Sequence, residues 1–214
     1  MIYNVKYRLG TYIAHPIWPE MNQIRTWSHL YKDSGFASFK KYLAHIGVKW
    51  EDFVETRSKS QQQFYRRDRE DQKSEIIIPA RQLQGAFMAS LTMCPEPNLS
   101  KYAPALNEAV VFSDANTGKF SRDFSFRRFT WDKRRKQKKQ RFQENDVIHN
   151  FSGEFTLNCL EDEFINSQNI LSYNNIRAVL DFMFRHCGIG ASRPLGYGRG
   201  ELLSITPVSV TELV

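Results

Sequence analysis

Cysteine is scarce in this sequence, and long apolar runs are missing altogether. Its 214 residues include three widely spaced cysteines, Cys94, Cys159 and Cys187. An odd number of distant cysteines argues against a disulfide framework and a zinc knuckle, and favours a reducing compartment. No segment approaches the ~18 apolar residues of a membrane span, and the first residues alternate with charge instead of forming a secretory signal. We therefore expect a soluble, cytoplasmic protein with no membrane partner.

Residues with metal or catalytic chemistry are also sparse. The five histidines are dispersed, and the sequence has neither a His-Glu-x-x-His motif nor carboxylates at metal-ligand spacing. We therefore expect no metal and no cofactor. Asp33 and His15 are weak catalytic candidates, the first for RNA cleavage and the second as a general base. A loop aspartate is more often a turn former or a helix cap, and no partner for His15 is evident, so the sequence favours a protein that is not an enzyme.

The excess of positive charge is confined to one short segment. The chain has 30 lysines and arginines against 23 acidic residues, a formal net charge of +7. Residues 133–141 contain seven cations and no acid. Such a cluster is either a solvated tip or a localisation signal, or it binds a polyanion by releasing its counterions. Aromatic residues from Phe124 to Phe142 bracket it, and cations beside aromatic rings suit single-stranded RNA.

Alternation and helical spacing predict an α+β chain. Apolar and polar residues alternate over Ile2–Ile13, as in a strand with one buried face. A β-branched strand, a proline and a helix then follow one another between Glu75 and Leu91. The further predicted elements are strands at Val110–Phe112, Val147–Leu157 and 201–208, and a helix over 176–187.

Two regions interrupt this pattern. Residues 20–74 include a polar excursion of mixed charge, Thr56–Ser74, and we interpret the region as a helical or irregular insertion. Residues 120–150 alternate aromatic and polar residues around the basic segment, which predicts a β-hairpin with 133–141 at its tip. With 41% apolar and 14% aromatic residues, the composition fits one globular domain over 1–214 that carries both insertions.

The glycines are concentrated near the end of the chain. Five of the eleven fall within Gly188–Gly200. A flexible linker would be filled out with small polar residues, whereas bulky and charged side chains separate these glycines. A helix precedes them and a strand follows, the reverse of the dinucleotide and Walker-type phosphate loops. Two interpretations stay open: a loop whose amides bind an anion together with Arg193 and Arg199, or a tight helix-to-strand turn.

Two motifs together resemble a known superfamily. The glycine loop, between a helix and the last strand, resembles the signature of the RAMP superfamily of CRISPR-associated proteins. The unit Ile76–Leu91 is similar to that superfamily's strand, proline and Leu-x-Gly-Ala helix, although Ala80 and Arg81 replace its small residues after the proline. The resemblance implies a ferredoxin-like, RNA-recognition-motif-like core, with 20–74 as an inserted finger and 120–150 as a protruding thumb hairpin.

The nearest subgroup implies a function in antiviral defence. Its members are guide-RNA-binding backbone subunits of multi-subunit CRISPR effectors, and several copies line a filament along the guide. The implied partners are single-stranded guide RNA (crRNA), target nucleic acid, copies of the chain itself and other effector subunits. By resemblance, the residues at the guide backbone are Arg81, Gln82, Gln84, Gly190, Ser192, Arg193, Gly196, Tyr197, Gly198 and Arg199. The predicted hairpin adds Arg127, Arg128, Lys133, Arg134, Arg135, Lys136, Lys138, Lys139 and Arg141.

Alternatives to this subgroup stay open. A guide-processing endoribonuclease of the same superfamily also ends in a glycine-rich loop, and its histidine would be His15, His29 or His45. In cleaving members an aspartate after the first strand cuts target RNA; Asp33 lies in a comparable region, but its surroundings differ and we assign it no catalytic role. A ribosomal or other RNA-binding protein would explain only the charge.

Overall fold

The chain folds into two compact units. One comprises Met1–Ala14 and Tyr65–Val214, and the other His15–Phe64. For residues 121–123, 126–132 and 137–143 only the backbone is described. The computed structural model describes residues 1–14, 18–60, 64–71, 73–95, 98–118, 121–123, 126–132, 137–143, 147–160, 170–191, 193 and 196–208.

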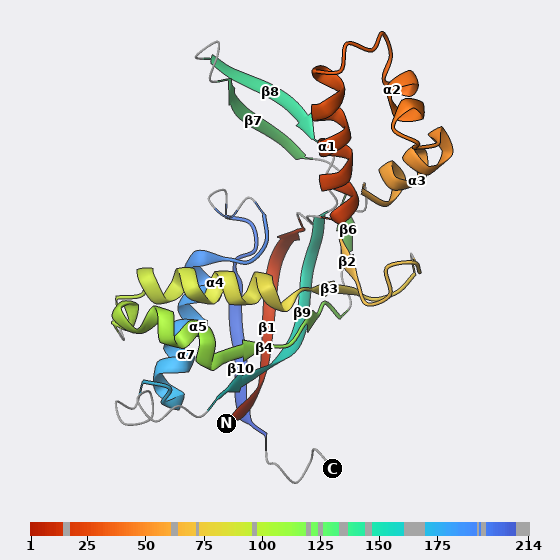
Figure 1. The fold of residues 1–214 in the computed structure, drawn as a ribbon. Coiled ribbons are helices and arrows are strands. Elements are labelled where there is room, and N and C mark those ends of the chain that lie inside the picture. The colour runs from red at the N-terminus through yellow and green to blue at the C-terminus, as the bar shows by residue number, and fades with distance from the viewer. Residues whose placement is uncertain are drawn as a thin grey trace. The chain divides into compact units, whose positions relative to one another are not determined.

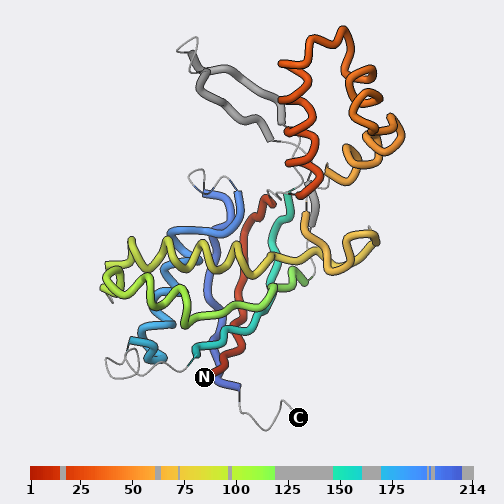
Figure 2. The backbone as a smooth tube through the Cα atoms, in the orientation of Figure 1, coloured from red at the N-terminus to blue at the C-terminus, as the bar shows by residue number. Residues whose placement is uncertain are grey.

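The first unit is built on an antiparallel sheet with the strand order β10-β1-β9-β4, and β6 also pairs with β9. In Figure 2, red β1 lies between blue β10 and teal β9. The register places Val5 of β1 opposite Phe155 of β9 and Ile205 of β10. The strands are β1 (Ile2–Ile13), β4 (Val110–Phe112), β6 (Ser121–Asp123), β9 (Val147–Cys159) and β10 (Gly200–Pro207).

Helices α4, α5 and α7 cover one face of this sheet (Figure 1). In chain order the core reads β1-α4-β4-β9-α7-β10, and with the strand order above this is the ferredoxin-like topology. The predicted α+β fold is therefore confirmed. The helices are α4 (Ala80–Met93), α5 (Ala103–Ala109), which follows the 3-10 turn η1 (Ser100–Tyr102), and α7 (Tyr173–Phe182), which continues into the π-helical turn η2 (Met183–Cys187).

The alternation in β1 sets the core. Val5, Tyr7 and Leu9 are fully buried against the helices, while the intervening Lys6 and Arg8 are exposed on the other face. The ring of Tyr7 stacks on Phe184 of η2, with the two centroids 5.3 Å apart. This burial confirms the predicted strand and shows which of its faces packs on the helices.

Within the described residues of the second unit, 18–60 and Phe64, lie three helices, α1 (Pro19–Lys32), α2 (Phe39–His45) and α3 (Trp50–Ser60). Its small core consists of Tyr42, Leu43 and Phe53, with further aromatic side chains packed around it. Residues 56–60 belong to α3, so the predicted exposed excursion begins too early. Polar side chains on its outer face hid this helix, because only Phe53 and Ser60 of α3 are buried.

A second, three-stranded sheet has the order β2-β3-β5, and a separate two-stranded sheet pairs β7 with β8. In this hairpin Phe126 lies opposite Gln143, and Asp132 opposite Gln137. The predicted tip, 133–141, is therefore too long, because backbone pairing continues through charged residues. Strand β9 belongs to the main sheet and is not the second strand of the hairpin. The strands are β2 (Tyr65–Arg66), β3 (Ile76–Ile78), β5 (Ala115–Asn116), β7 (Phe126–Asp132) and β8 (Gln137–Gln143).

Candidate nucleic-acid interface

The glycine loop is fastened to the end of β1. The amide of Gly198 donates to the carbonyl of Thr11 at 2.8 Å, and the amide of Ala191 donates to the carbonyl of Ile13, also at 2.8 Å. Backbone bonds therefore hold both limbs of the loop against the strand. Such a loop has a fixed shape, unlike a linker.

Close packing between the two limbs of the glycine loop explains why residue 198 is a glycine. The amide of Ile189 donates to the carbonyl of Gly198 at 3.0 Å. A Cβ atom added at Gly198 would lie 1.8 Å from the carbonyl oxygen of Ile189, and the φ angle of Gly198 is 75°. By contrast, Gly196 has a φ angle of 88° with no heavy atom within 4 Å of an added Cβ. Position 198 therefore requires glycine because a side chain has no room there. Position 196 favours glycine only because of its positive φ angle.

The helix that leads into the loop ends in an unusual way. The amide of Gly188 donates to the carbonyl of Met183 at 2.8 Å, a spacing of five residues that defines the π-helical turn η2. Met183, Phe184 and Cys187 of this turn are buried. Single π-helical turns inside α-helices are frequent at functional sites, and the apolar spacing of the sequence does not distinguish them from an α-helix.

Arg81, at the start of α4, is held by Tyr65 of β2. Its guanidinium carbon lies 4.9 Å from the centroid of the Tyr65 ring, and its Nη2 donates a hydrogen bond to the Tyr65 hydroxyl. Tyr65 is buried whereas Arg81 is exposed. A guanidinium has five N–H donors, so the side chain is fixed in direction and still has donors to offer. Tyr65 could not be identified from the sequence, because cation–π partners have no fixed spacing.

Tyr12 connects the start of α4 to the glycine loop. Its hydroxyl donates to the Oε1 atom of Gln82 at 2.8 Å. An added Cβ at Gly190 would lie 2.7 Å from the Cε2 atom of the same ring. Burial raises the pKa of Tyr12 above its ordinary value, so the hydroxyl remains a neutral donor. Since Tyr12 occupies the amide oxygen of Gln82, the Gln82 amide NH₂ is the group that can donate to a ligand.

Two neighbouring side chains have structural partners instead. The Nε2 atom of Gln84 donates to both the carbonyl oxygen and the Oδ1 atom of Asn107, each at 3.2 Å, and so ties α4 to α5. The Oδ1 atom of Asp114 accepts from the amide of Ala80 at 2.8 Å and caps α4. The residues Asp114–Gly118 are typical of a turn, and this composition does not reveal the cap. Gln84 therefore joins two helices, whereas Arg81 and Gln82 contact Tyr65 and Tyr12.

The other predicted residues divide into those that the structure describes and those that it does not. Arg199 is exposed and Arg193 half-buried in the loop, while Asp33 forms the C-cap of α1. His15, Ser192, Lys133, Arg134, Arg135 and Lys136 lie outside the described residues. For Arg127, Arg128, Lys138, Lys139 and Arg141 the structure describes only the backbone.

The sheet face opposite the helices is polar. Lys6 and Arg8 of β1 and Glu154 of β9 are exposed there, and the guanidinium of Arg8 pairs with Glu201 of β10 at 3.0 Å. RNA-recognition motifs stack bases on aromatic side chains of their open sheet. The outward positions of β1 and β9, from Asn4 to Arg8 and from Ser152 to Thr156, carry no aromatic ring. A base-stacking platform is therefore absent from these two strands.

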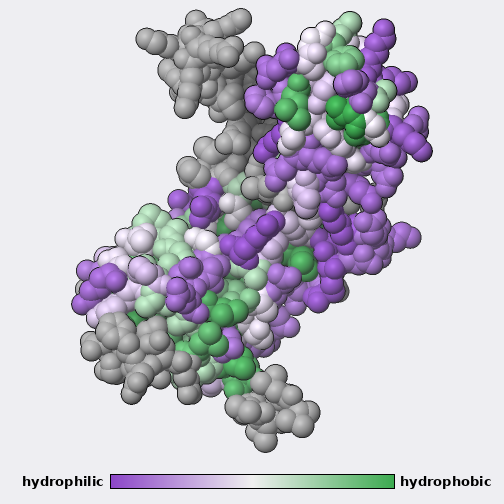
Figure 3. All heavy atoms as spheres, viewed as in Figure 1, coloured by the Kyte–Doolittle hydropathy of each residue, from purple (hydrophilic) through white to green (hydrophobic). Residues whose placement is uncertain are grey.

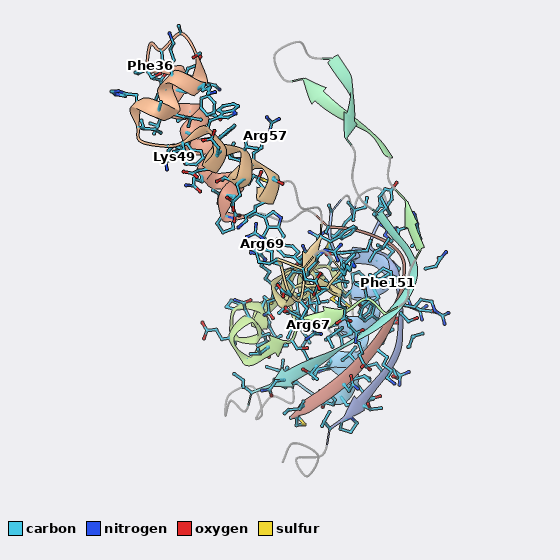
Figure 4. All side chains as sticks on the ribbon, turned by 90° about the vertical axis from the view of Figure 1, so that its right-hand side faces the viewer. Phe36, Lys49, Arg57, Arg67, Arg69 and Phe151 are labelled. Atoms are coloured by element: carbon cyan, nitrogen blue, oxygen red, sulfur yellow. The ribbon has the colours of Figure 1, made fainter. Side chains whose placement is uncertain are left out.

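The segment between β2 and β3 presents a strongly hydrophilic surface (Figure 3). Figure 4 labels Arg67 and Arg69 on this segment. The Nη2 atom of Arg67 lies 3.1 Å from the Glu75 carboxylate, and Asp68, Glu70 and Asp71 add further negative charge. This balance gives the segment no excess charge with which to attract a polyanion.

Neither a metal centre nor a membrane span accompanies this interface in the described part of the chain. Within it, no group of three or more His, Cys, Asp or Glu side chains is placed to hold a metal ion. None of the helices described is both long and apolar enough to cross a membrane.

Comparisons with known proteins identify no family. No protein-family model matches the chain, and no curated protein matches it. Among solved structures, it is similar to a chain of the "Cryo-EM structure of the Type III-B Cmr-beta bound to cognate target RNA", with a TM-score of 0.46 and 14% sequence identity. The match covers 96% of this chain and 60% of that one. We rest no functional conclusion on a likeness of this size.

Proposed function

We propose that this chain is a CRISPR RNA-binding backbone subunit of the RAMP superfamily, several copies of which line the guide RNA of an antiviral ribonucleoprotein complex. The glycine loop and the start of α4 form one wall of the RNA track, and the basic hairpin forms the other. The two motifs that resemble the superfamily support this proposal, because they occupy the same end of one ferredoxin-like core.

The observation that carries the proposal is the position of Tyr12. Its ring lies against Gly190 of the glycine loop, and its hydroxyl bonds to Gln82 of α4. One buried side chain thus joins two motifs that lie more than a hundred residues apart in the sequence. A glycine loop that served only as a turn would need no connection to the start of α4.

The chemistry of this edge fits a nucleic-acid backbone. Arg81, Arg193 and Arg199 supply cations, and Gln82 supplies an amide donor. Such groups bind phosphate and sugar without reading sequence. A backbone subunit needs this property, since it has to accept a guide of any sequence.

The endoribonuclease of the same superfamily is the alternative, and no described contact favours it. His45 lies against Phe36, with ring centroids 5.0 Å apart, and His29 is exposed on α1. Purified protein incubated with precursor guide RNA distinguishes the two functions. We expect no cleavage, whereas cleavage that His29→Ala, His45→Ala or His15→Ala abolishes would support the alternative.

The glycine-loop arginines provide the test of the RNA track. We expect Arg193→Ala with Arg199→Ala to weaken binding of single-stranded RNA at low salt by about tenfold or more. The slope of log affinity against log salt should fall by about 1.4, because two phosphate contacts are lost. Fluorescence anisotropy with a labelled oligonucleotide measures both quantities.

Arg185→Ala is the matched control for that test. Arg185 is exposed on η2, just before the loop, and its Nε atom bonds to Asp181 at 2.9 Å. We expect its loss to leave the RNA affinity nearly unchanged. Equal binding by the double variant and the unmodified chain at low salt would remove the glycine loop from the interface.

A further inference from the structure

An exposed tryptophan on the helical unit stands among lysines. Trp50 is the first residue of α3, and 36% of its surface is exposed. The Nζ atom of Lys40, on α2, lies 5.4 Å from the centroid of the Trp50 ring. Lys41 and Lys49 flank these two residues and are exposed, and Figure 4 labels Lys49 on this unit.

Core contacts fix the indole in place. The centroids of Trp50 and Phe53 lie 5.2 Å apart with an interplanar angle of 35°. Phe53 is in turn buried against Phe39, with centroids 5.2 Å apart. The indole is therefore anchored on the core while part of its surface remains open. A ligand that stacks on it has little side-chain entropy to remove.

Charge alone does not explain this surface. Lys40, Lys41 and Lys49 are offset in part by Glu51 and Asp52, which lie in the first turn of α3 and interact favourably with its dipole. The local excess is one positive charge, too small for tight binding of a polyanion by charge alone. The open indole is what distinguishes this surface from an ordinary solvated helix face.

We propose that Trp50 and Lys40 form a contact for single-stranded nucleic acid in which one base stacks on the indole. The base displaces the Lys40 ammonium from the ring, and Lys40 with Lys41 and Lys49 then binds the adjoining phosphates. Stacking on an aromatic side chain tolerates any base, because every base has a π-face. An acidic peptide would need only the lysines, so the exposed ring favours nucleic acid.

This contact goes beyond the proposed function, since it gives the helical unit His15–Phe64 a binding role. It shares no residue with the glycine-loop edge, so its consequences can be measured with separate variants. We therefore expect substitution of the loop arginines and substitution of Trp50 to lower the affinity of the full chain for single-stranded nucleic acid independently of each other. Effects on free energy usually add for sites that share no partners.

The test uses the full chain and a labelled oligouridine. Trp50→Ala should weaken binding about five- to a hundredfold, the range measured for loss of one stacked base. Trp50→Phe keeps a ring against Phe53 and should stay within about threefold of the unmodified chain. Lys40→Gln removes a charge from an exposed position, so it should preserve the fold, weaken binding and reduce the salt slope by about 0.7.

Val54→Ala is the control, because Val54 is 48% exposed on the same helix and has no polar group to offer. It should leave the affinity unchanged. Normal binding by both Trp50→Ala and Lys40→Gln would overturn the contact, even if the loop arginine variant still lost affinity and so upheld the proposed function. Loss of labelled poly-glutamate binding in Lys40→Gln, with oligouridine binding unchanged in Trp50→Ala, would overturn it in favour of an acidic peptide. No binding of oligouridine by the unmodified chain would overturn both proposals.

Discussion

At Gly198 the fold leaves no room for a side chain, and this makes a sharp test of the loop. Gly198→Ala would bring a Cβ within 1.8 Å of the Ile189 carbonyl oxygen, whereas Gly196→Ala would meet no atom within 4 Å. Both glycines have positive φ angles, so both variants bear the same backbone strain of about 1–2 kcal/mol. We expect Gly198→Ala to reduce the free energy of unfolding by a further ~1–3 kcal/mol, because the clash forces the backbone to move.

Urea unfolding followed by circular dichroism measures this difference, with Gly196→Ala as the control for strain alone. Equal stability of the two variants would show that the limbs of the loop separate easily. The bonds from Gly198 to Thr11 and from Ile189 to Gly198 would then contribute little to its shape.

Some contacts made by single residues could not be predicted from the sequence. Arg81 and Gln82 are candidates because of their place in a motif, and their role in binding stays a prediction. Tyr65 and Asp114, which hold Arg81 and cap α4, could not be identified in this way. Each of the two contacts α4 from a separate strand or loop, so its role depends on tertiary placement. Neither periodicity nor turn chemistry contains that information.

Among the elements, those with one buried face were predictable. The structure gives β1 and β4 the predicted bounds, because alternation records which face is buried. Helix α1 was not predicted, and none of its residues is buried. Strands β2 and β5 have two residues each, too few for any period to show. The order of the core strands and helices could thus be predicted from the sequence. For the insertions, only their approximate position could be predicted.

The cations of the hairpin β7–β8 can be removed without deleting a strand. Lys138, Lys139 and Arg141 lie in β8, so their replacement by Gln removes three charges without deleting the strand. We expect the fold to be retained and the salt slope of RNA binding to fall by about 2, because single-stranded RNA contributes about 0.7 per phosphate contact. Affinity measured over a series of salt concentrations gives this slope.

A control with the same loss of charge separates position from net charge. Lys6 lies on the open face of the sheet, Lys59 pairs with Glu55 at 3.3 Å, and Lys101 lies over Tyr102. Replacement of these three by Gln should leave the slope almost unchanged. Equal slopes in the two triple variants would mean that the hairpin acts only through the overall charge of the protein.

For the whole molecule, the topology of the main sheet brings the end of β1, the start of β9 and the glycine loop to the same end of the strands. β1 runs antiparallel to β9, and Ile13 at its end lies opposite Val147, where β9 begins. The short strand β4 pairs with the other end of β9, since Phe112 lies opposite Leu157, whereas β6, which precedes the hairpin, pairs Asp123 with Val147. In the sequence, the helical unit follows β1, and the segment with the hairpin joins β4 to β9. The glycine loop precedes β10, which also begins at this end of the sheet. Tyr12, near the end of β1, thus joins the glycine loop to the start of α4 at this end of the sheet.

A backbone subunit that uses one edge of the core to bind RNA should add copies as the RNA lengthens. We expect complexes with single-stranded RNAs of increasing length to grow in steps of one chain, 25.1 kDa, because each copy covers a fixed stretch of the phosphate backbone. Native mass spectrometry measures the number of copies, and the Arg193→Ala, Arg199→Ala variant should show fewer copies at the same concentration. A single copy on RNAs of every length would contradict the filament and favour an RNA-binding protein that acts alone. Steps of two chains would instead indicate a dimer as the repeating unit, and the RNA track would then have to run across two cores.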